Sequence, residues 1–450
     1  MKRALCFLLA VVLIVSMFSG CAGGAEPLRI VIDVQVTSGT ALNERLSGPL
    51  LELKNSLEDT AGITDFVIEI IPGSGAERAN MLDRIRTEIM SGEGPDVFII
   101  RNAGGEWFEK EGELLFQMPE KAMELGYFLP LDDYIENAKF ADWDMFTPEV
   151  MAAGSNREGQ QIVPISYALP AVMYRASDFE HIPSDMTWSE MLNSEELYEA
   201  AALLGDCYEI RGFKDYPIDY ILGRLADFEK DELLFTEEEL MKHVTEICEL
   251  TTYSVQNQLS TKEFCAETGS FGYGFNSTGG GISGPDISLA DGKLNGITDR
   301  DTLTLVPFYS DQGGCTAMIS VYAAVNRNTR NPQAAFDAID CLLMNNKFRY
   351  SDLYKCFLVS GAVSYCTPIH EGLMSEELPL NYGLSFSLTE ENLAAVNSVR
   401  RQITNAQFSG PLHTVLQRMM IECYTAYQIG EDYTDIVSEA YQDLKIILSE

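Results

Sequence analysis

The apolar positions between residues 28 and 100 change their spacing repeatedly, and each change predicts a new element. Residues 28–36 are rich in Ile and Val, which indicates a buried strand. A helix is expected next, because Ala61-Gly62 is a helix-ending signal and leucines recur before it at helical spacing. These leucines are Leu46, Leu50, Leu53 and Leu57.

The same alternation continues through the following segments. Residues 63–71 predict a second strand, which Pro72-Gly73 ends. A second helix then carries Leu82, Ile85 and Ile89 on one face, and residues 97–100 predict a third strand. Strands and helices that alternate at this spacing indicate parallel pairing with right-handed crossovers. Because ligands of such sheets bind at the carboxyl ends of the strands, the loops after the first and third strands are the expected site.

The N-terminal segment predicts export. Lys2 and Arg3 precede the uncharged, mostly apolar residues 4–18, and Ser19-Gly20-Cys21 follows. The apolar stretch is shorter than the roughly 18 residues that a membrane-spanning helix needs. The pattern resembles a bacterial lipobox, with Phe18 in place of the usual Leu. This resemblance implies a signal peptide over 1–20, a lipidated Cys21, a tether over 21–27 and anchoring at the extracellular face of the cytoplasmic membrane. The alternative is a signal anchor whose cysteine lies in a turn.

Composition and charge exclude some classes of function. The chain has 31 Lys and Arg against 68 Asp and Glu, a formal net charge of -37. Nucleic-acid binding needs a basic surface, so no nucleic acid is expected as a partner. The length behind the signal suggests two to three domains, and 46% hydrophobic residues suffice for substantial cores.

The ten cysteines do not form a recognisable framework. Cys6 leaves with the signal, Cys21 would carry lipid, and the other cysteines are widely and irregularly spaced, without a C-x-x-C pair or a Cys/His group for zinc. Either these cysteines are buried small apolar residues or they form one or two bridges. We expect no metal and no cofactor.

Loose motifs over most of the chain carry a family resemblance. In order they are residues 51–71, 94–97, 126–135, 161–167, 173–175, 186–190, 305–314 and 331–336, then two C-terminal helices at 416–428 and 433–448. Among them are Gly94-Pro95-Asp96-Val97 and Thr187-Trp188-Ser189-Glu190. Their order and spacing resemble the extracellular solute-binding proteins of ABC importers, the type that includes sugar-binding lipoproteins.

The resemblance implies an α/β, two-lobe periplasmic-binding-protein-like fold. Each lobe would hold a mixed, mostly parallel sheet flanked by helices, with the ligand cleft at the hinge. Crossovers between the lobes are expected at 164–171, 320–324 and 365–368, which gives lobe one as 28–166 with 323–365 and lobe two as 167–322 with 366–450. A monomer would close on a small solute without chemistry, and a membrane permease would recognise the closed form.

Ligand-binding side chains are expected after the first and third strands, near the first crossover and in the loop-rich stretch before the second. They are Thr37, Ser38, Arg101, Asn102, Trp107, Tyr167, Tyr273, Asn276 and Gln312. Aromatic rings stack on sugars and polar groups bind their hydroxyls, so a mono- or oligosaccharide is preferred. Packing within a lobe is the alternative for each aromatic. Arg101 would instead suit an anionic group.

Enzymatic motifs are incomplete. Residues 279–284 match G-x-G-x-x-G, yet Pro285-Asp286 follows instead of a helix, and the chain has no P-loop, G-x-S-x-G or H-E-x-x-H motif. We therefore expect no enzyme. Because a glycosidase carboxylate pair is not readable from spacing, a secreted glycoside-acting hydrolase stays an alternative, as does a surface sensor or adhesion lipoprotein.

Overall fold

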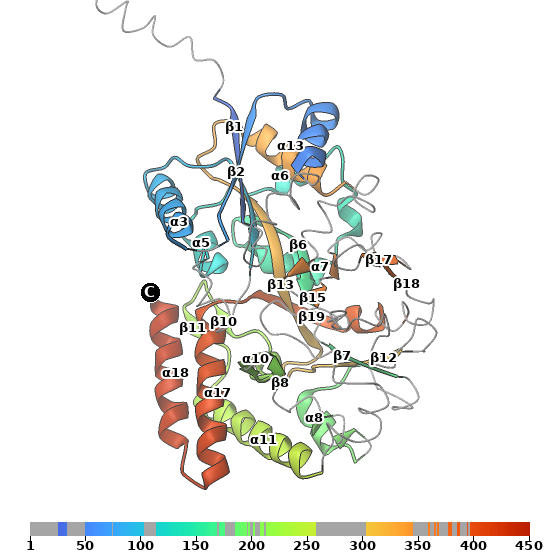
Figure 1. Cartoon of the computed structure of the whole chain (residues 1–450), viewed down its shortest axis with the longest axis vertical. Coiled ribbons are helices and arrows are strands. Elements are labelled where there is room, and N and C mark those ends of the chain that lie inside the picture. Colours follow the sequence, from blue (N-terminus) through green and yellow to red (C-terminus); the bar gives the residue numbers. More distant parts are fainter. Residues whose placement is uncertain are drawn as a thin grey trace, which may run out of the picture.

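The largest sheet of the computed structural model is mixed and has seven strands, which come from the N-terminal, middle and C-terminal parts of the chain (Figure 1). The structure describes residues 26–33, 50–73, 75–102, 114–168, 171–175, 185–195, 197–198, 201–202, 208–210, 213–257, 303–344, 359–360, 364–365, 367–368, 377–379, 385–387, 394 and 397–450. The strand order is β16-β6-β13-β3-β1-β2, and β19 pairs with β13 outside this path. The strands are β1 (Leu28–Asp33), β2 (Phe66–Ile70), β3 (Val97–Arg101), β6 (Ile162–Ala168), β13 (Cys315–Val325), β16 (Thr367–Pro368) and β19 (Ile403–Phe408).

The predicted alternation of strands and helices is confirmed at the start of this sheet. β1 pairs in parallel with β2 on one side and with β3 on the other. The helix α3 (Gly75–Met90) between β2 and β3 buries the apolar face that the sequence predicts. The earlier helix covers residues 50–56 and continues as a π-helical turn, η1 (Leu57–Ala61). Gly62 ends it with a φ of 69°, a left-handed conformation that glycine adopts without steric cost.

Buried apolar side chains form two separate cores. The first draws on residues 28–167, 317–343 and 399–408, and the second on residues 188–250, 308–318 and 412–448. We call the parts around these cores the first and the second lobe. β13 contributes to both, since Met318 packs in the second core and Ile319 in the first.

The second lobe is mainly helical where it is described. Its helices are α8 (Trp188–Asn193), α10 (Ile218–Leu222), α11 (Glu237–Gln256), α17 (Pro411–Ile429) and α18 (Thr434–Ser449). α11 begins at a capping box, in which the Thr236 side chain accepts from the Glu239 backbone N–H and the Glu239 carboxylate accepts from that of Thr236. The paired C-terminal helices expected from the sequence are α17 and α18, which lie side by side below the sheet in Figure 1.

Apart from β13, which contributes to both cores, the described strands of the second lobe pair in antiparallel two-stranded ladders. These are β7 (Ala171–Arg175) with β12 (Leu303–Pro307), β8 (Tyr208–Ile210) with β9 (Phe213–Asp215), and β10 (Ala226–Asp227) with β11 (Glu232–Leu233). The mostly parallel sheet that the sequence predicts for this lobe does not appear among the described residues. The parallel ladders lie in the first lobe. Parallel strands need a long crossover connection, and α3 supplies one between β2 and β3.

Short elements complete the described part of the chain. Those of the first lobe include α5 (Pro119–Glu124), α6 (Asp132–Glu136), η2 (Trp143–Met145), α7 (Pro148–Met151), η3 (Ala152–Gly154), β4 (Ser155–Asn156), β5 (Gly159–Gln160) and α13 (Pro332–Leu342). The remaining short strands are β14 (Val359–Ser360), β15 (Ser364–Tyr365), β17 (Glu377–Pro379) and β18 (Ser385–Ser387). Within the described ranges, no helix has the length and apolar character to cross a membrane.

The three segments predicted as crossovers lie side by side. Val321 of β13 lies opposite Ser166 of β6, and Tyr167 of β6 lies opposite Thr367 of β16. A further passage between the cores follows β19, since Phe408 packs in the first core and Leu412 in the second. Residues 399–408, which the predicted boundaries assign to lobe two, therefore pack in the first core.

Candidate functional site

The carboxyl end of β3 meets the middle of β13, where the chain passes between the lobes. Asn102 donates its backbone N–H to the Ser320 carbonyl at 2.7 Å and its Nδ2 to the Ile319 carbonyl at 3.2 Å. Arg101 lies opposite Val321 of β13, and Ser166 of β6 lies opposite the same residue. The ends of β3 and β6 therefore flank one point of β13, which places the predicted site residues Arg101, Asn102 and Tyr167 at the ends of the two strands on either side of β13.

The Tyr167 hydroxyl is held by an arginine from a distant part of the chain. Arg400 donates its Nε to Tyr167 Oη at 3.0 Å and its Nη2 to Thr147 Oγ1 at 3.2 Å. Both Tyr167 and Arg400 are buried. The sequence analysis missed Arg400, because nothing local indicates that a residue just before β19 reaches the end of β6.

Polar side chains recur along β13 where an apolar core strand is expected. Thr316, Ser320 and Tyr322 are buried at even positions, and Ser320 Oγ has no hydrogen-bond partner among the described residues. The same holds for Asn102 Oδ1, one strand away. Because buried polar groups are normally paired, these groups mark the contact between the end of β3 and the middle of β13 as polar. The signal that could have predicted it is the presence of Thr316, Ser320 and Tyr322 within the otherwise apolar segment Cys315–Val325.

Gln312 lies in a turn of the second lobe, and its amide binds backbone groups there. Its Nε2 donates to the carbonyls of Leu222 and Arg224, both at 2.9 Å, and its Oε1 accepts from the Arg224 N–H at 3.1 Å. Tyr309, in the same turn, is buried and donates its hydroxyl to Gln402 Oε1 at 2.7 Å. Burial raises the pKa of the Tyr309 hydroxyl.

Several predicted residues lie outside the described residues. They are the lipidation residue Cys21 and the ligand residues Thr37, Ser38, Trp107, Tyr273 and Asn276. Four cysteines are described, and each is buried with a free thiol: Cys248, Cys315, Cys341 and Cys423. The described residues hold no group of three His, Cys, Asp or Glu side chains that could bind a metal ion.

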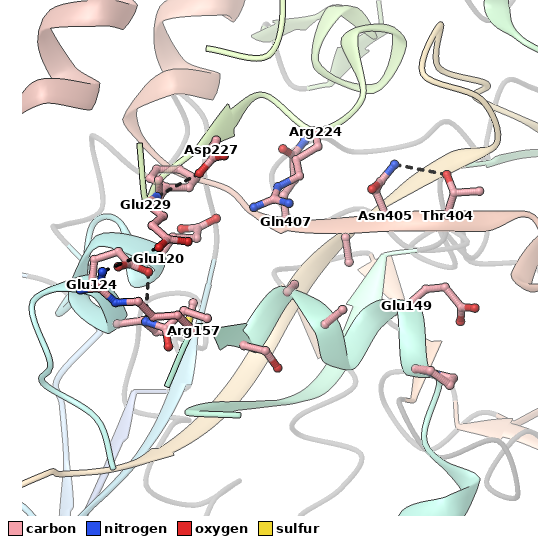
Figure 2. A pocket seen from close by; sticks show the side chains of 18 residues that line it. Glu120, Glu124, Glu149, Arg157, Arg224, Asp227, Glu229, Thr404, Asn405 and Gln407 are labelled. Carbon is pink, nitrogen blue, oxygen red and sulfur yellow. Dashed lines mark hydrogen bonds and ion pairs between the residues drawn. The ribbon is translucent and has the colours of Figure 1, made fainter. Parts of the chain in front are cut away.

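A pocket of about 620 Å³ opens between the two lobes (Figure 2). The first lobe lines it with α5, the α7–η3 segment, the β4–β5 turn and β19, and the second lobe with residues 224–229. Its charged lining residues are Glu120, Glu124, Glu149, Arg157, Arg224, Asp227 and Glu229. The predicted ligand residues that the structure describes, Arg101, Asn102, Tyr167 and Gln312, do not line this pocket, so it is distinct from the described part of the strand-end site.

Glu120 is the most perturbed acid of the pocket. Its Oε1 accepts from the Phe408 backbone N–H at 3.2 Å, where β19 leads toward the second lobe. Burial raises the pKa of Glu120 to about 7, although that hydrogen bond and the charge of Arg224 oppose the rise. Glu120 therefore changes its charge near neutral pH at a point where both lobes meet.

Comparison with known proteins gives relatives by structure alone. No family model matches the chain, and no curated protein matches it by sequence. An extracellular solute-binding protein family 1 from Alicyclobacillus acidocaldarius superposes with a TM-score of 0.53 at 14% identity, covering 95% of this chain and 100% of its own. The cyclic alpha-maltosyl-1,6-maltose binding protein from Arthrobacter globiformis gives 0.54 at 16% identity, covering 94% and 99%.

A third similar structure is the sugar-binding protein MalE from Xanthomonas citri, with a TM-score of 0.52 at 13% identity over 94% of this chain and 97% of its own. At such low identities the likeness establishes the fold. The protein has the α/β two-lobe fold of the extracellular solute-binding proteins, as its sequence motifs predict.

Proposed function

We propose that the protein is the lipid-anchored extracellular solute-binding component of an ABC importer. The observation that supports this proposal is the presence of two separate cores, with the segments predicted to connect them lying on adjacent strands. A solute bound between two such lobes contacts both of them and stabilises the closed arrangement. The closed form would then deliver the solute to a membrane permease.

A mono- or oligosaccharide is the preferred solute. Two of the similar structures are named as sugar-binding or maltosyl-maltose-binding proteins, which supports this class. The polar residues at the proposed hinge can bind hydroxyl groups. Asn102 Oδ1, for example, is a hydrogen-bond acceptor without a donor among the described residues. The proposed ligand residues are Thr37, Ser38, Arg101, Asn102, Trp107, Tyr167, Tyr273, Asn276 and Gln312. The proposed lobe boundaries are those given from the sequence, except that residues 399–408 pack in the first core.

The decisive experiment is a thermal-shift screen of the mature protein, residues 21–450, against sugars, peptides and polyamines. At a hundredfold excess over Kd, the true ligand should add about 2.7 kcal/mol of stability. X-ray scattering with that ligand should show a smaller radius of gyration. A thermal shift without compaction would contradict lobe closure as the binding mechanism. Turnover of the sugar would favour a secreted hydrolase instead.

Substitutions then distinguish a sugar from an anion. If a sugar binds, Trp107→Ala or Tyr273→Ala should weaken binding by about 1–3 kcal/mol through lost stacking area. Melting temperatures without ligand control for lost packing. If both variants keep wild-type affinity while Arg101→Ala abolishes binding, an anionic solute is the better interpretation.

A further inference from the structure

Two hairpin turns from opposite lobes face each other at the rim of the pocket. The β4–β5 turn of the first lobe carries Arg157, and the β10–β11 turn of the second lobe carries Glu229 and Asp231. Arg157 Nη1 lies 3.7 Å from Glu229 Oε1, and Lys121 of α5 forms an ion pair with Asp231. Charges of opposite sign therefore meet across the boundary between the lobes at two places.

Each of the two turns contains a residue with a positive φ angle. Gly159 has a φ of 107°, and a Cβ there would lie 1.8 Å from the Asp132 carboxylate, so only glycine fits. Asp231 has a φ of 57°, an uncommon conformation for a residue with a side chain. The β10–β11 turn also contains an ion pair, in which Lys230 Nζ lies 2.5 Å from Asp227 Oδ2.

Hydrogen bonds between the lobes continue along the pocket. Gln407 of β19 accepts from the Leu225 N–H and donates to the Gly223 carbonyl, both at 3.1 Å. Within the first lobe, Glu120 holds the same strand by accepting from the backbone N–H of Phe408, the next residue of β19. The lobes therefore meet beside the pocket through the buried hydrogen bonds of the Gln407 side chain and through ion pairs at the two turns.

We propose that this pocket face is a lobe-positioning contact, whose ion pairs Lys121–Asp231 and Arg157–Glu229 hold the two lobes at a set angle. The contact itself does not depend on the proposed function; only its effect on ligand binding rests on that function. Any motion of one lobe against the other changes the separation of these two turns, because each belongs to a different core. The pairs therefore bias the equilibrium between lobe arrangements without touching the strand-end site.

Salt gives a test that needs no ligand. Sodium chloride screens exposed ion pairs, with a Debye length that falls from roughly 20 Å to about 4 Å between about 20 mM and about 500 mM. We expect the radius of gyration of the mature protein, or hydrogen exchange at the two turns, to change over this range. Lys121→Met, Asp231→Asn and the double variant should reproduce the high-salt behaviour at low salt, and each should lose most of the salt response. Asparagine is chosen because it tolerates a positive φ.

Arg418→Ala is the matched control, because Arg418 pairs with Asp443 at 3.6 Å within the second lobe alone. This control should keep the wild-type radius and salt response. The proposal is overturned if the Lys121 and Asp231 variants keep both readouts unchanged, or if Arg418→Ala alters them equally. With a ligand in hand, the same variants should change its Kd about two- to fivefold, and failure of the solute screen would leave the salt test valid.

Discussion

Arg78 and Asp33 form a bidentate ion pair inside the first lobe, with Nη1–Oδ1 and Nη2–Oδ2 distances of 2.8 Å each. Arg78 also donates to the Pro72 carbonyl at 3.0 Å. Both charged side chains are only 2% exposed. Since Asp33 ends β1, this pair fixes the strand end from which the predicted ligand loop with Thr37 begins.

Removing one partner of this pair should destabilise the protein strongly. Asp33→Asn leaves a buried guanidinium without its counter-charge, which typically costs about 3–5 kcal/mol. The double variant Asp33→Leu with Arg78→Met should recover much of that loss, because it removes both charges. Urea unfolding of the three proteins measures the effect, and a loss below about 1 kcal/mol for Asp33→Asn would contradict the assignment.

His413 should make stability fall as the solution becomes acidic. Its ring is buried, Nδ1 accepts from the Gly410 N–H at 3.1 Å, and burial lowers the pKa of His413 to about 4. Between pH 6.5 and 4 the unfolded chain binds a proton here that the folded chain does not, so folding weakens as pH falls. Between pH 7 and pH 5, the free energy of unfolding of His413→Gln should therefore fall by on the order of 1–2 kcal/mol less than that of the wild type. Equal losses in denaturant titrations would exclude His413 as the cause.

Glu120 should make stability fall as the solution becomes more basic, which is opposite to the effect of His413. Its pKa in the folded protein is raised to about 7, so the unfolded chain loses this proton first, and stability falls as pH rises from about 4.5 to 7. Glu120→Gln should therefore gain stability at pH 8, on the order of 1–2 kcal/mol, and little at pH 5, where the wild-type carboxyl is already protonated. A gain independent of pH would point to a packing effect.

Cys21 is expected to carry the lipid anchor. Cys21→Ser should release the protein into the medium or leave an unprocessed precursor, because the thiol is the acceptor of the lipid that the processing signal implies. Cell fractionation and the mass of the membrane-bound form measure the outcome. Normal cleavage with unchanged membrane retention would show that another feature anchors the chain.

The sequence by itself determined the elements that depend on local pattern. The first three strands and α3 follow from the spacing of apolar residues, because one face of each must be buried. The paired C-terminal helices are expected from the family resemblance. Even Arg78 lies on the buried face of α3, four residues before Leu82. The order of the loose motifs was enough to indicate a two-lobe α/β fold.

Only the tertiary structure decided which distant residues meet. Arg400 reaches Tyr167 across 233 positions, and Lys121 meets Asp231 across 110, so no local pattern could pair them. The packing of β19 in the first core was likewise invisible, because a six-residue strand can pair with either lobe until its neighbours are placed. Local spacing determines which face of an element is buried, whereas the partner of each charge depends on how whole elements pack together.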